Sequence, residues 1–179
     1  MARESAEGQA LELGWRLDNK PDVRENDYLE MVLKKTCWLA AIHPMRTGAL
    51  IATNGGCDPD PFIRYGFFMG AAFQIQDDLL NLVGDAVRYG KELGGDLYEG
   101  KRTLMLIHVL EQGTAAERER VLRLLAVPRA EKAESEVRWL RGRMDAYGAI
   151  EHARAVANGL SGAATVELGR IFRGMPASR

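Results

Sequence analysis

The sequence is poor in cysteine and in net charge, and each shortage excludes a class of protein. Its two cysteines, Cys37 and Cys57, are far apart, which excludes a CxxC zinc site and a disulfide framework. We expect both to be buried free thiols in a reducing compartment. A formal net charge of −1 over 179 residues argues against a general nucleic-acid binder.

Long apolar runs are missing as well. No segment reaches the ~18 apolar residues of a membrane-spanning helix, and the first five residues lack the apolar run of a signal peptide. We therefore expect a soluble, cytoplasmic protein with no transmembrane segment. With 46% hydrophobic and 27% charged residues, the composition predicts one globular domain over residues 1–179.

The spacing of apolar residues predicts an all-α fold, a helical bundle without competing strand patterns. Capping boxes are expected at 27–30 and 114–117, Pro44 is expected to break or kink a helix, and Gly159 and Gly162 to interrupt the last one. The expected helices are 4–16, 27–42, 46–54, 61–83, 103–112, 115–125, 129–147 and 149–172.

The most informative segment is an acidic pair on an apolar helix. Asp77 and Asp78 follow residues 67–75, which are almost wholly apolar. Burying two adjacent carboxylates without a partner is costly or forces one to protonate, and a divalent cation removes that penalty. Mg²⁺ typically takes one or two protein carboxylates together with phosphate oxygens of the substrate. We therefore expect a metal site here rather than a solvated helix face.

A glycine- and lysine-rich segment, residues 85–102, follows the acidic pair and is predicted to be a flexible diphosphate-binding loop. Lys91 and Lys101 each follow a glycine, which allows close approach of the backbone to phosphate. The alternative is an ordinary basic loop, which is less expected because loops of this length are usually functional. Asp96 is either a further metal or water ligand or a turn-capping residue.

These motifs together resemble the trans-isoprenyl diphosphate synthases, also called polyprenyl synthetases. The second aspartate-rich motif of that family, FQxxDDxxD, is matched by residues 73–81, with Asn81 in place of the last aspartate. Asparagine can accept a water or touch a metal but contributes no charge. Further matches, in the order of the family, are GQxxE at 8–12, KT at 35–36, GK at 90–91, GGDL at 94–97 and GKRT at 100–103.

The resemblance implies part of an isoprenoid-synthase-type fold and specific roles for the matched residues. The expected Mg²⁺ ligands are Asp77, Asp78 and Asn81. The expected contacts to substrate diphosphate are Lys35, Thr36, Gln74, Lys91 and Lys101, and the catalytic set is Asp77, Asp78, Lys35 and Lys101. For Lys35 the alternative is a solvated lysine at a helix C-terminus. For Gln74 the alternative is a buried amide whose hydrogen bonds are made by backbone groups.

The resemblance also implies the reaction. In this family of isoprenoid biosynthesis, Mg²⁺ draws diphosphate off an allylic substrate, and isopentenyl diphosphate attacks the resulting carbocation. The first aspartate-rich motif of the family and its arginine pair have no match in this sequence. The match is therefore to the carboxy-terminal half of a synthase of polyprenyl or geranylgeranyl type. We expect little or no activity from this chain alone.

Three hypotheses follow for the working protein. The first is a split prenyltransferase that acts when a separate amino-terminal half is supplied. The second is a non-catalytic subunit that forms a homo- or hetero-oligomer with a synthase-type chain. The third is a structural relic or an interaction module, a helical protein that binds no substrate. The retained lysines and aspartates argue against the third, and the apolar surface left by a missing half-bundle favours a partner.

Overall fold

The structure is a computed structural model that describes residues 2–84 and 94–174. In these ranges every regular element is a helix, as predicted, and none is long and apolar enough to span a membrane. The elements are α1 (Ala2–Leu17), α2 (Glu25–Val32), η1 (Leu33–Ile42), α3 (His43–Ala52), α4 (Pro61–Val83), α6 (Gly95–Glu99), α7 (Leu104–Gln112), α8 (Ala115–Ala126), η2 (Arg129–Glu131), α9 (Glu134–Ala146) and α10 (Ala149–Gly174).

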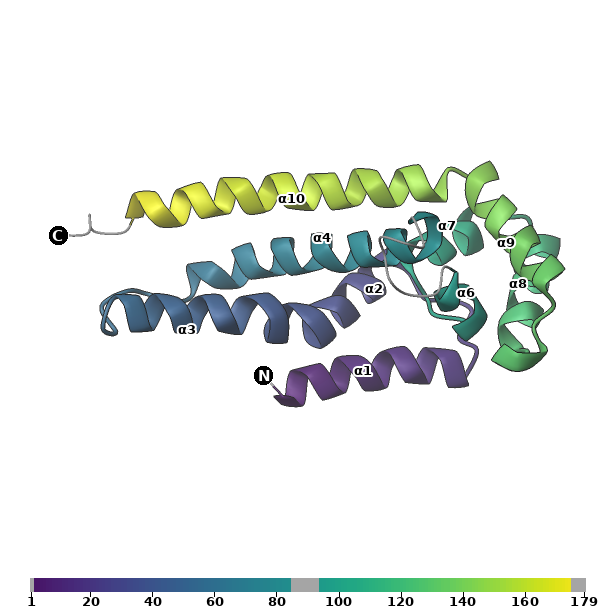
Figure 1. Ribbon diagram of the computed structural model, residues 1–179, viewed down its shortest axis with the longest axis horizontal. Helices are drawn as coiled ribbons and strands as arrows, with labels where there is room; N and C mark the ends of the chain where they lie inside the picture. Colours follow the sequence, from purple (N-terminus) through teal and green to yellow (C-terminus); the bar gives the residue numbers. More distant parts are fainter. Residues whose placement is uncertain (1, 85–93, 175–179) are drawn as a thin grey trace.

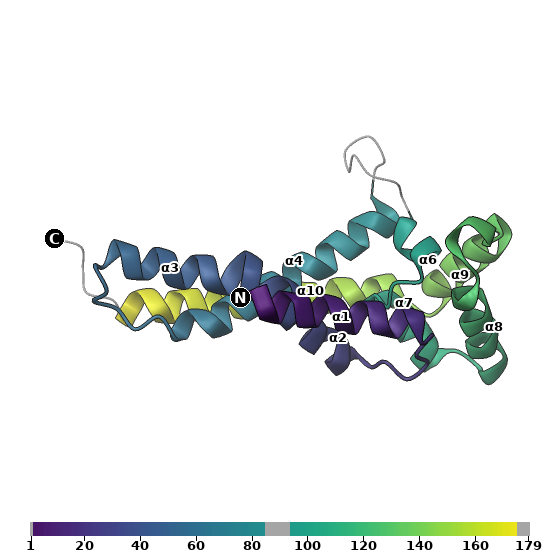
Figure 2. The same ribbon diagram turned by 90° about the horizontal axis from the view of Figure 1, so that it is seen from below.

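The long helices lie side by side in an elongated bundle (Figure 1). Helix α10 packs along α4, α4 packs against the rod formed by α2, η1 and α3, and α1 lies on the other side of η1. The short helices α6 to α9 gather at one end of the bundle (Figure 2). One apolar core joins these parts because the helices bury their apolar side chains where they meet.

The start of the rod differs from the prediction. The capping box expected at 27–30 is wrong, because α2 begins at Glu25 and its N-cap is Arg24, three residues before the predicted cap Asp27. The backbone N–H of Arg24 donates to Oδ2 of Asp27 at 2.9 Å. Asp27 therefore sits inside the first turn and accepts the hydrogen bond, where the prediction made it the residue that caps.

Pro44 does not break the rod. The backbone of His43 stays helical, and its N–H donates to the carbonyl of Trp38, five residues back. This is the hydrogen-bond pattern of a π-helix, which η1 follows over ten residues. Pro44 falls on the first turn of α3, where the missing N–H of proline is tolerated. The chain therefore passes from a π-helix to an α-helix at this point without leaving the helical conformation.

Close helix contacts fix η1 in place. A Cβ atom on Gly8 of α1 would lie 2.3 Å from the backbone N of Lys35, and one on Gly70 of α4 would lie 2.8 Å from Sγ of Cys37. Only glycine permits such approaches, so α1 and α4 clamp η1 from two sides. Cys37 is a buried free thiol as predicted, and burial raises its pKa to about 12, whereas the free Cys57 is only half-buried.

The C-terminal helices also correct the prediction. The helix expected at 129–147 is a 3-10 turn, η2, followed by the separate helix α9. Helix α10 runs without interruption through Gly159 and Gly162. An isolated glycine costs a helix only about 1 kcal/mol, and the packing of α10 along α4 outweighs that cost. The capping box at 114–117 is confirmed, since Thr114 and Glu117 exchange side-chain and backbone hydrogen bonds.

Glu117 is expected to stay ionised to unusually low pH. Hydrogen bonds from Tyr147 first, then from Thr114 and Arg143, lower its pKa from 4.5 to about 2. Because the pKa is lowered in the folded state, the stabilisation is fully present above pH 4.5 and is lost as the pH falls towards 2. An NMR titration of the side-chain carboxyl should place the midpoint near 2. Tyr147→Phe should raise it, and a midpoint near 4.5 in both proteins would contradict the assignment.

Candidate functional site

The centre of the site is the carboxylate of Asp78, which is 1% exposed. Tyr28 Oη donates to Oδ2 at 2.8 Å, Gln74 Nε2 donates to Oδ1 at 3.0 Å, and Lys101 Nζ donates to Oδ1 at 2.6 Å. A carboxylate this deep needs such partners to remain ionised. The sequence favoured a divalent cation for this compensation, and in the structure a lysine and two neutral donors supply it.

Lys101 joins the acidic helix to the segment that follows α6. Its Nζ also donates to Asp96 Oδ2 at 3.3 Å. Burial on its own would lower the pKa of Lys101, but the charges of Asp78 and Asp96 outweigh burial and raise that pKa. Burial raises the pKa of Asp96, against the opposing effect of Lys101. Lys101 is therefore a fixed positive charge held between two carboxylates.

The amide of Asn81 anchors α6 to the acidic helix. Its Oδ1 accepts from the backbone N–H of Asp96 at 3.1 Å, and its backbone carbonyl accepts from Gly94 N–H at 2.7 Å. The side chain is buried. The oxygen predicted to meet a metal is thus engaged with the backbone in this conformation, and its role as a metal ligand stays a prediction.

Helix α6 lies inside the segment 85–102 that was predicted to be a loop, and the prediction is wrong for that part. Gly94 and Gly100 bound the helix, with left-handed φ angles of +73° and +71°. The glycines that suggested a loop therefore begin and end a short helix, because only glycine adopts this conformation without strain. Lys91, predicted to bind diphosphate, and the rest of 85–93 lie outside the described residues.

Asp77 is half-buried and shares a face of α4 with the other predicted ligands. At 3.6 residues per turn, positions 74, 77, 78 and 81 fall within about 100° of the helix circumference. Gln74, Asp78 and Asn81 from this set all make side-chain contacts within the site. The helix therefore presents the four motif side chains in one direction.

Lys35 and Thr36 enter the site from η1. Thr36 Oγ1 donates to Gln74 Oε1 at 2.8 Å, which links η1 through Gln74 to Asp78. The amide of Gln74 is satisfied by side chains, so the backbone-satisfied alternative is wrong. Lys35 Nζ donates to Glu12 Oε2 on α1 rather than extending into solvent. The ion pair removes the alternative of a solvated lysine.

Two residues of this network were not predicted as site residues. Tyr28 is fully buried, and burial together with the charge of Asp78 raises its pKa well above the usual value, so it remains a donor. Its position seven residues before Lys35, on the same helical face, was an available signal. Glu12 is buried, and its Oε1 has no hydrogen-bond partner among the described residues. That oxygen can accept from a ligand.

The charges of the network fit a cation bound together with an anion. Four carboxylates and two ammonium groups lie in or beside it, leaving two net negative charges: Glu12, Asp77, Asp78 and Asp96 with Lys35 and Lys101. In the part of the chain that the structure describes, no three His, Cys, Asp or Glu side chains gather closely enough to hold a metal alone. Mg²⁺ suits this arrangement because it completes its shell with water and phosphate.

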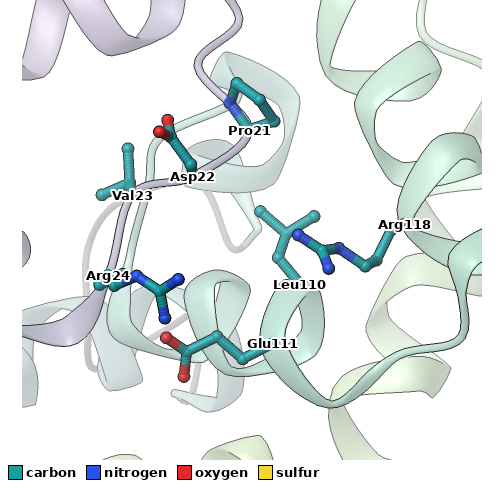
Figure 3. Close-up of a pocket in the computed structure, with 7 residues that line it drawn as sticks. All are labelled: Pro21, Asp22, Val23, Arg24, Leu110, Glu111 and Arg118. Carbon is teal, nitrogen blue, oxygen red and sulfur yellow. The ribbon is translucent and has the colours of Figure 1, made fainter.

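Two other polar features lie away from this network. Arg46 pairs with Asp60 at 2.8 Å and ties α3 to the start of α4. A separate pocket of about 280 Å³ lies beside the connection from α1 to α2. In Figure 3 the side chain of Arg24 lies near Glu111, and that of Arg118 points inward beside Leu110. None of the predicted site residues lines that pocket.

The sequence of this chain is similar to a known protein family and to its members. A family model described as polyprenyl synthetase matches residues 1–144. A short chain isoprenyl diphosphate synthase of Methanothermobacter thermautotrophicus is 40% identical over 154 residues, covering 84% of this chain and 44% of the relative.

Solved structures share the fold over nearly the whole chain. A polyprenyl synthase of Caulobacter crescentus, complexed with calcium and isoprenyl diphosphate, matches with a TM-score of 0.81 and 28% identity, over 98% of this chain and 51% of that one. A geranylgeranyl pyrophosphate synthase of Corynebacterium glutamicum, complexed with isoprenyl diphosphate and magnesium, matches with a TM-score of 0.81 and 25% identity, over 94% and 47%. The chain thus spans about half the length of the proteins it matches.

Proposed function

This chain belongs to the polyprenyl synthetase family, and on that premise we propose that it supplies the Mg²⁺ and diphosphate half of a prenyltransferase site. The reaction is the condensation of isopentenyl diphosphate with an allylic diphosphate. The observation that carries the proposal is the buried pair of Asp78 and Lys101, which brings the FQxxDD and GKRT motifs together. The solved relatives titled as complexes with isoprenyl diphosphate and a divalent metal support it.

In this proposal each side chain has a separate task. Asp77 and Asp78 hold Mg²⁺, which when bound stabilises the charge that develops on the departing diphosphate. Lys35 and Lys101 bind the diphosphate, and each exchanges a carboxylate oxygen for a phosphate oxygen when the substrate arrives. That exchange releases oxygens of Glu12 and Asp78, so substrate binding and metal binding support each other.

Neighbouring side chains position the proposed metal and diphosphate ligands. Thr36 and Gln74 orient the carboxylate of Asp78 through their hydrogen-bond chain, and Asn81 holds α6 and with it Asp96. Lys91 remains a proposed diphosphate ligand from the family motif. Together these groups would keep the acidic helix and the lysines aligned for a shared phosphate.

A partner surface belongs to the same proposal. Met69, Phe73 and Leu80 are exposed on one stripe of α4. We place there the helices of a synthase-type chain that would bring the second set of carboxylates, in a homo- or hetero-oligomer. Such a stripe is costly to leave in water.

A second function is favoured by one observation. Asn81 carries no charge, and its oxygen is engaged with the backbone of Asp96. A site with fewer charged ligands suits a non-catalytic subunit that partners an active synthase. An assay of prenyltransferase activity distinguishes the catalytic function from that of a non-catalytic subunit, because such a subunit would bind its partner but contribute nothing to product formation.

A chimera provides the test of catalysis. The region of the Methanothermobacter thermautotrophicus synthase matched by this chain is replaced by the chain itself, and elongation of an allylic diphosphate by radiolabelled isopentenyl diphosphate is measured. The chimera should form product, whereas the 179-residue chain alone should form little or none. Asp77→Asn in the chimera should lower kcat/KM by about 10²–10³, and the exposed Asp145→Asn should not.

Two results would overturn parts of this account. Clear elongation by the 179-residue chain alone would show that the residues named here suffice. A chimera that unfolds cooperatively, with a melting temperature close to that of the parent synthase, but forms no product would contradict the catalytic role. It would favour the function of a non-catalytic subunit.

A further inference from the structure

The guanidinium of Arg102 is a buried charge to which the proposed function gives no task, although the residue directly follows Lys101 in the GKRT motif. Arg102 is 1% exposed. It donates to three neutral oxygens, which are the carbonyl of Gly100 at 2.7 Å, Oδ1 of Asn19 at 2.8 Å and the carbonyl of Lys20 at 3.4 Å. The guanidinium therefore joins the GKRT segment to the connection between α1 and α2.

A positive charge in this position is costly. In residues 2–84 and 94–174, no carboxylate is among the partners of Arg102. Burial first, and then the charge of Arg16, lower the pKa of Arg102 to about 10, so the group is still protonated at neutral pH. A buried cation loses hydration that neutral oxygens replace only in part. An apolar side chain would fill this space at lower cost, so packing alone does not account for an arginine here.

Asn19 connects this guanidinium to the rest of the molecule. Its backbone has a left-handed φ of +44°, a conformation in which glycine is the usual residue. Both ends of its amide are used, since Oδ1 accepts from Arg102 and Nδ2 donates to the carbonyl of Leu122 in α8 at 2.9 Å. An asparagine at this turn thus gains two hydrogen bonds that glycine would lack, and they link α8 to Arg102.

The contacts of Arg102 fix the backbone of Lys101 on both sides. Arg102 itself follows the lysine, and the carbonyl that it holds belongs to Gly100, which precedes the lysine. The backbone N–H of Lys101 in addition donates to the carbonyl of Asp96 at 3.0 Å. From this fixed backbone, Lys101 Nζ reaches Oδ1 of Asp78 at 2.6 Å.

We propose that Arg102 and Asn19 are positioning residues for Lys101, which they hold in place beside Asp78 for contact with diphosphate. The inference rests on the proposed function, in which Lys101 binds diphosphate. A lysine side chain is long and flexible, so the positions open to its Nζ depend on how firmly its backbone is held. A displacement of about 1 Å by a distant substitution can cost an enzyme about 10²-fold in rate.

Two variants remove these contacts by different routes, and both should weaken Mg²⁺-dependent binding of inorganic diphosphate about tenfold. Asn19→Gly keeps the left-handed turn without strain and removes only the amide. Arg102→Met removes the guanidinium without leaving a buried charge behind. The double variant should bind no more weakly than Arg102→Met alone, because the two residues act through one shared contact. Asn19→Asp retains an oxygen for Arg102 and should bind as the wild type does.

The matched control is Val137→Ala, which removes buried methyl groups from α9. It should lower the melting temperature, because it leaves a cavity, and leave the affinity for diphosphate unchanged. Thermal unfolding identifies the temperature at which every variant is folded, and calorimetry is performed below it. If Arg102→Met does not fold, Asn19→Gly decides. The proposal is overturned if Asn19→Gly binds diphosphate as tightly as Val137→Ala, since Asn19 and Arg102 would then contribute to stability alone.

NMR of the ligand-free protein separates this proposal from the proposed function. The side-chain resonances of Lys101 Nζ and of the Asp78 carboxyl carbon should shift in Asn19→Gly and remain in place in Val137→Ala and Asn19→Asp. Unshifted resonances in Asn19→Gly would refute the positioning role, whatever the wild type binds. Shifted resonances in a protein whose wild type binds no diphosphate would instead contradict the proposed function and leave the positioning of Lys101 in force.

Discussion

Replacing Lys101 with alanine is expected to destabilise the protein by about 3–5 kcal/mol and to abolish diphosphate binding. The substitution leaves Asp78 buried with two neutral donors and no positive partner among the residues that the structure describes. Urea unfolding gives the loss of stability, and calorimetry gives the loss of binding. The structural control is Lys34→Ala, a half-buried lysine paired with the exposed Glu30, which should cost less than about 1 kcal/mol.

A double variant separates folding from binding. Asp78→Asn combined with Lys101→Met removes both charges and should recover most of the stability, because no buried charge is left alone. Diphosphate binding should stay lost. Equal loss of stability in the single and double variants would show that the ion pair does not stabilise the site in the way described.

Gly8→Ala is expected to cost about 1–3 kcal/mol or more and to weaken diphosphate binding. The new Cβ would lie 2.3 Å from the backbone N and 2.7 Å from the Cα of Lys35, and backbone cannot rotate away as a side chain can. Helix α1 must therefore move off η1. That movement separates Glu12 from Lys35 and displaces the lysine from the site.

The matched control lies on the same helix. A Cβ on Gly14 meets nothing within 4 Å, so Gly14→Ala should stabilise α1 by up to about 1 kcal/mol. Thermal unfolding of both variants measures the contrast, and crystal structures or NMR shifts at Lys35 report the displacement. Similar melting temperatures for the two variants would contradict the close contact at Gly8.

The parts of the fold that depend on local sequence were predictable. Helix α4 begins at Pro61 and ends at Val83 as expected, because a proline start and an apolar run of this length leave little choice. The capping box at Thr114 was also predictable, because it depends only on Thr114 and on Glu117 three residues later. Every described element is helical, as the periodicity indicated.

The parts set by contacts between distant segments were not predictable. The π-helical turn of η1 depends on close packing against α1 and α4, and nothing in the local sequence separates it from an α-helix. Helix α6 is held by Asn81, which lies on the preceding element. A glycine pattern alone suggested a loop there.

In the site, too, the features set by local sequence were predictable and those set by distant contacts were not. The FQxxDD motif predicted Gln74, Asp77, Asp78 and Asn81 as site residues, and the regular spacing of a helix puts these four positions on one face of α4. The partner of Asp78 was predicted as a metal, because a sequence does not show that Lys101 folds back 23 positions to meet it. Tyr28 lies 50 positions from Asp78 and was overlooked for the same reason.

Isothermal titration of the chain with inorganic diphosphate, with and without Mg²⁺, tests the central claim most directly. The account predicts binding that requires Mg²⁺, that is lost in Asp77→Ala/Asp78→Ala and in Asp77→Asn, and that is retained in Asp145→Asn. The milder Asp77→Asn keeps the buried Asp78 intact, so a loss of binding there is not a loss of folding. Folded wild-type protein that binds no diphosphate, or binds it equally with and without Mg²⁺, would contradict the claim that these residues form a Mg²⁺–diphosphate site.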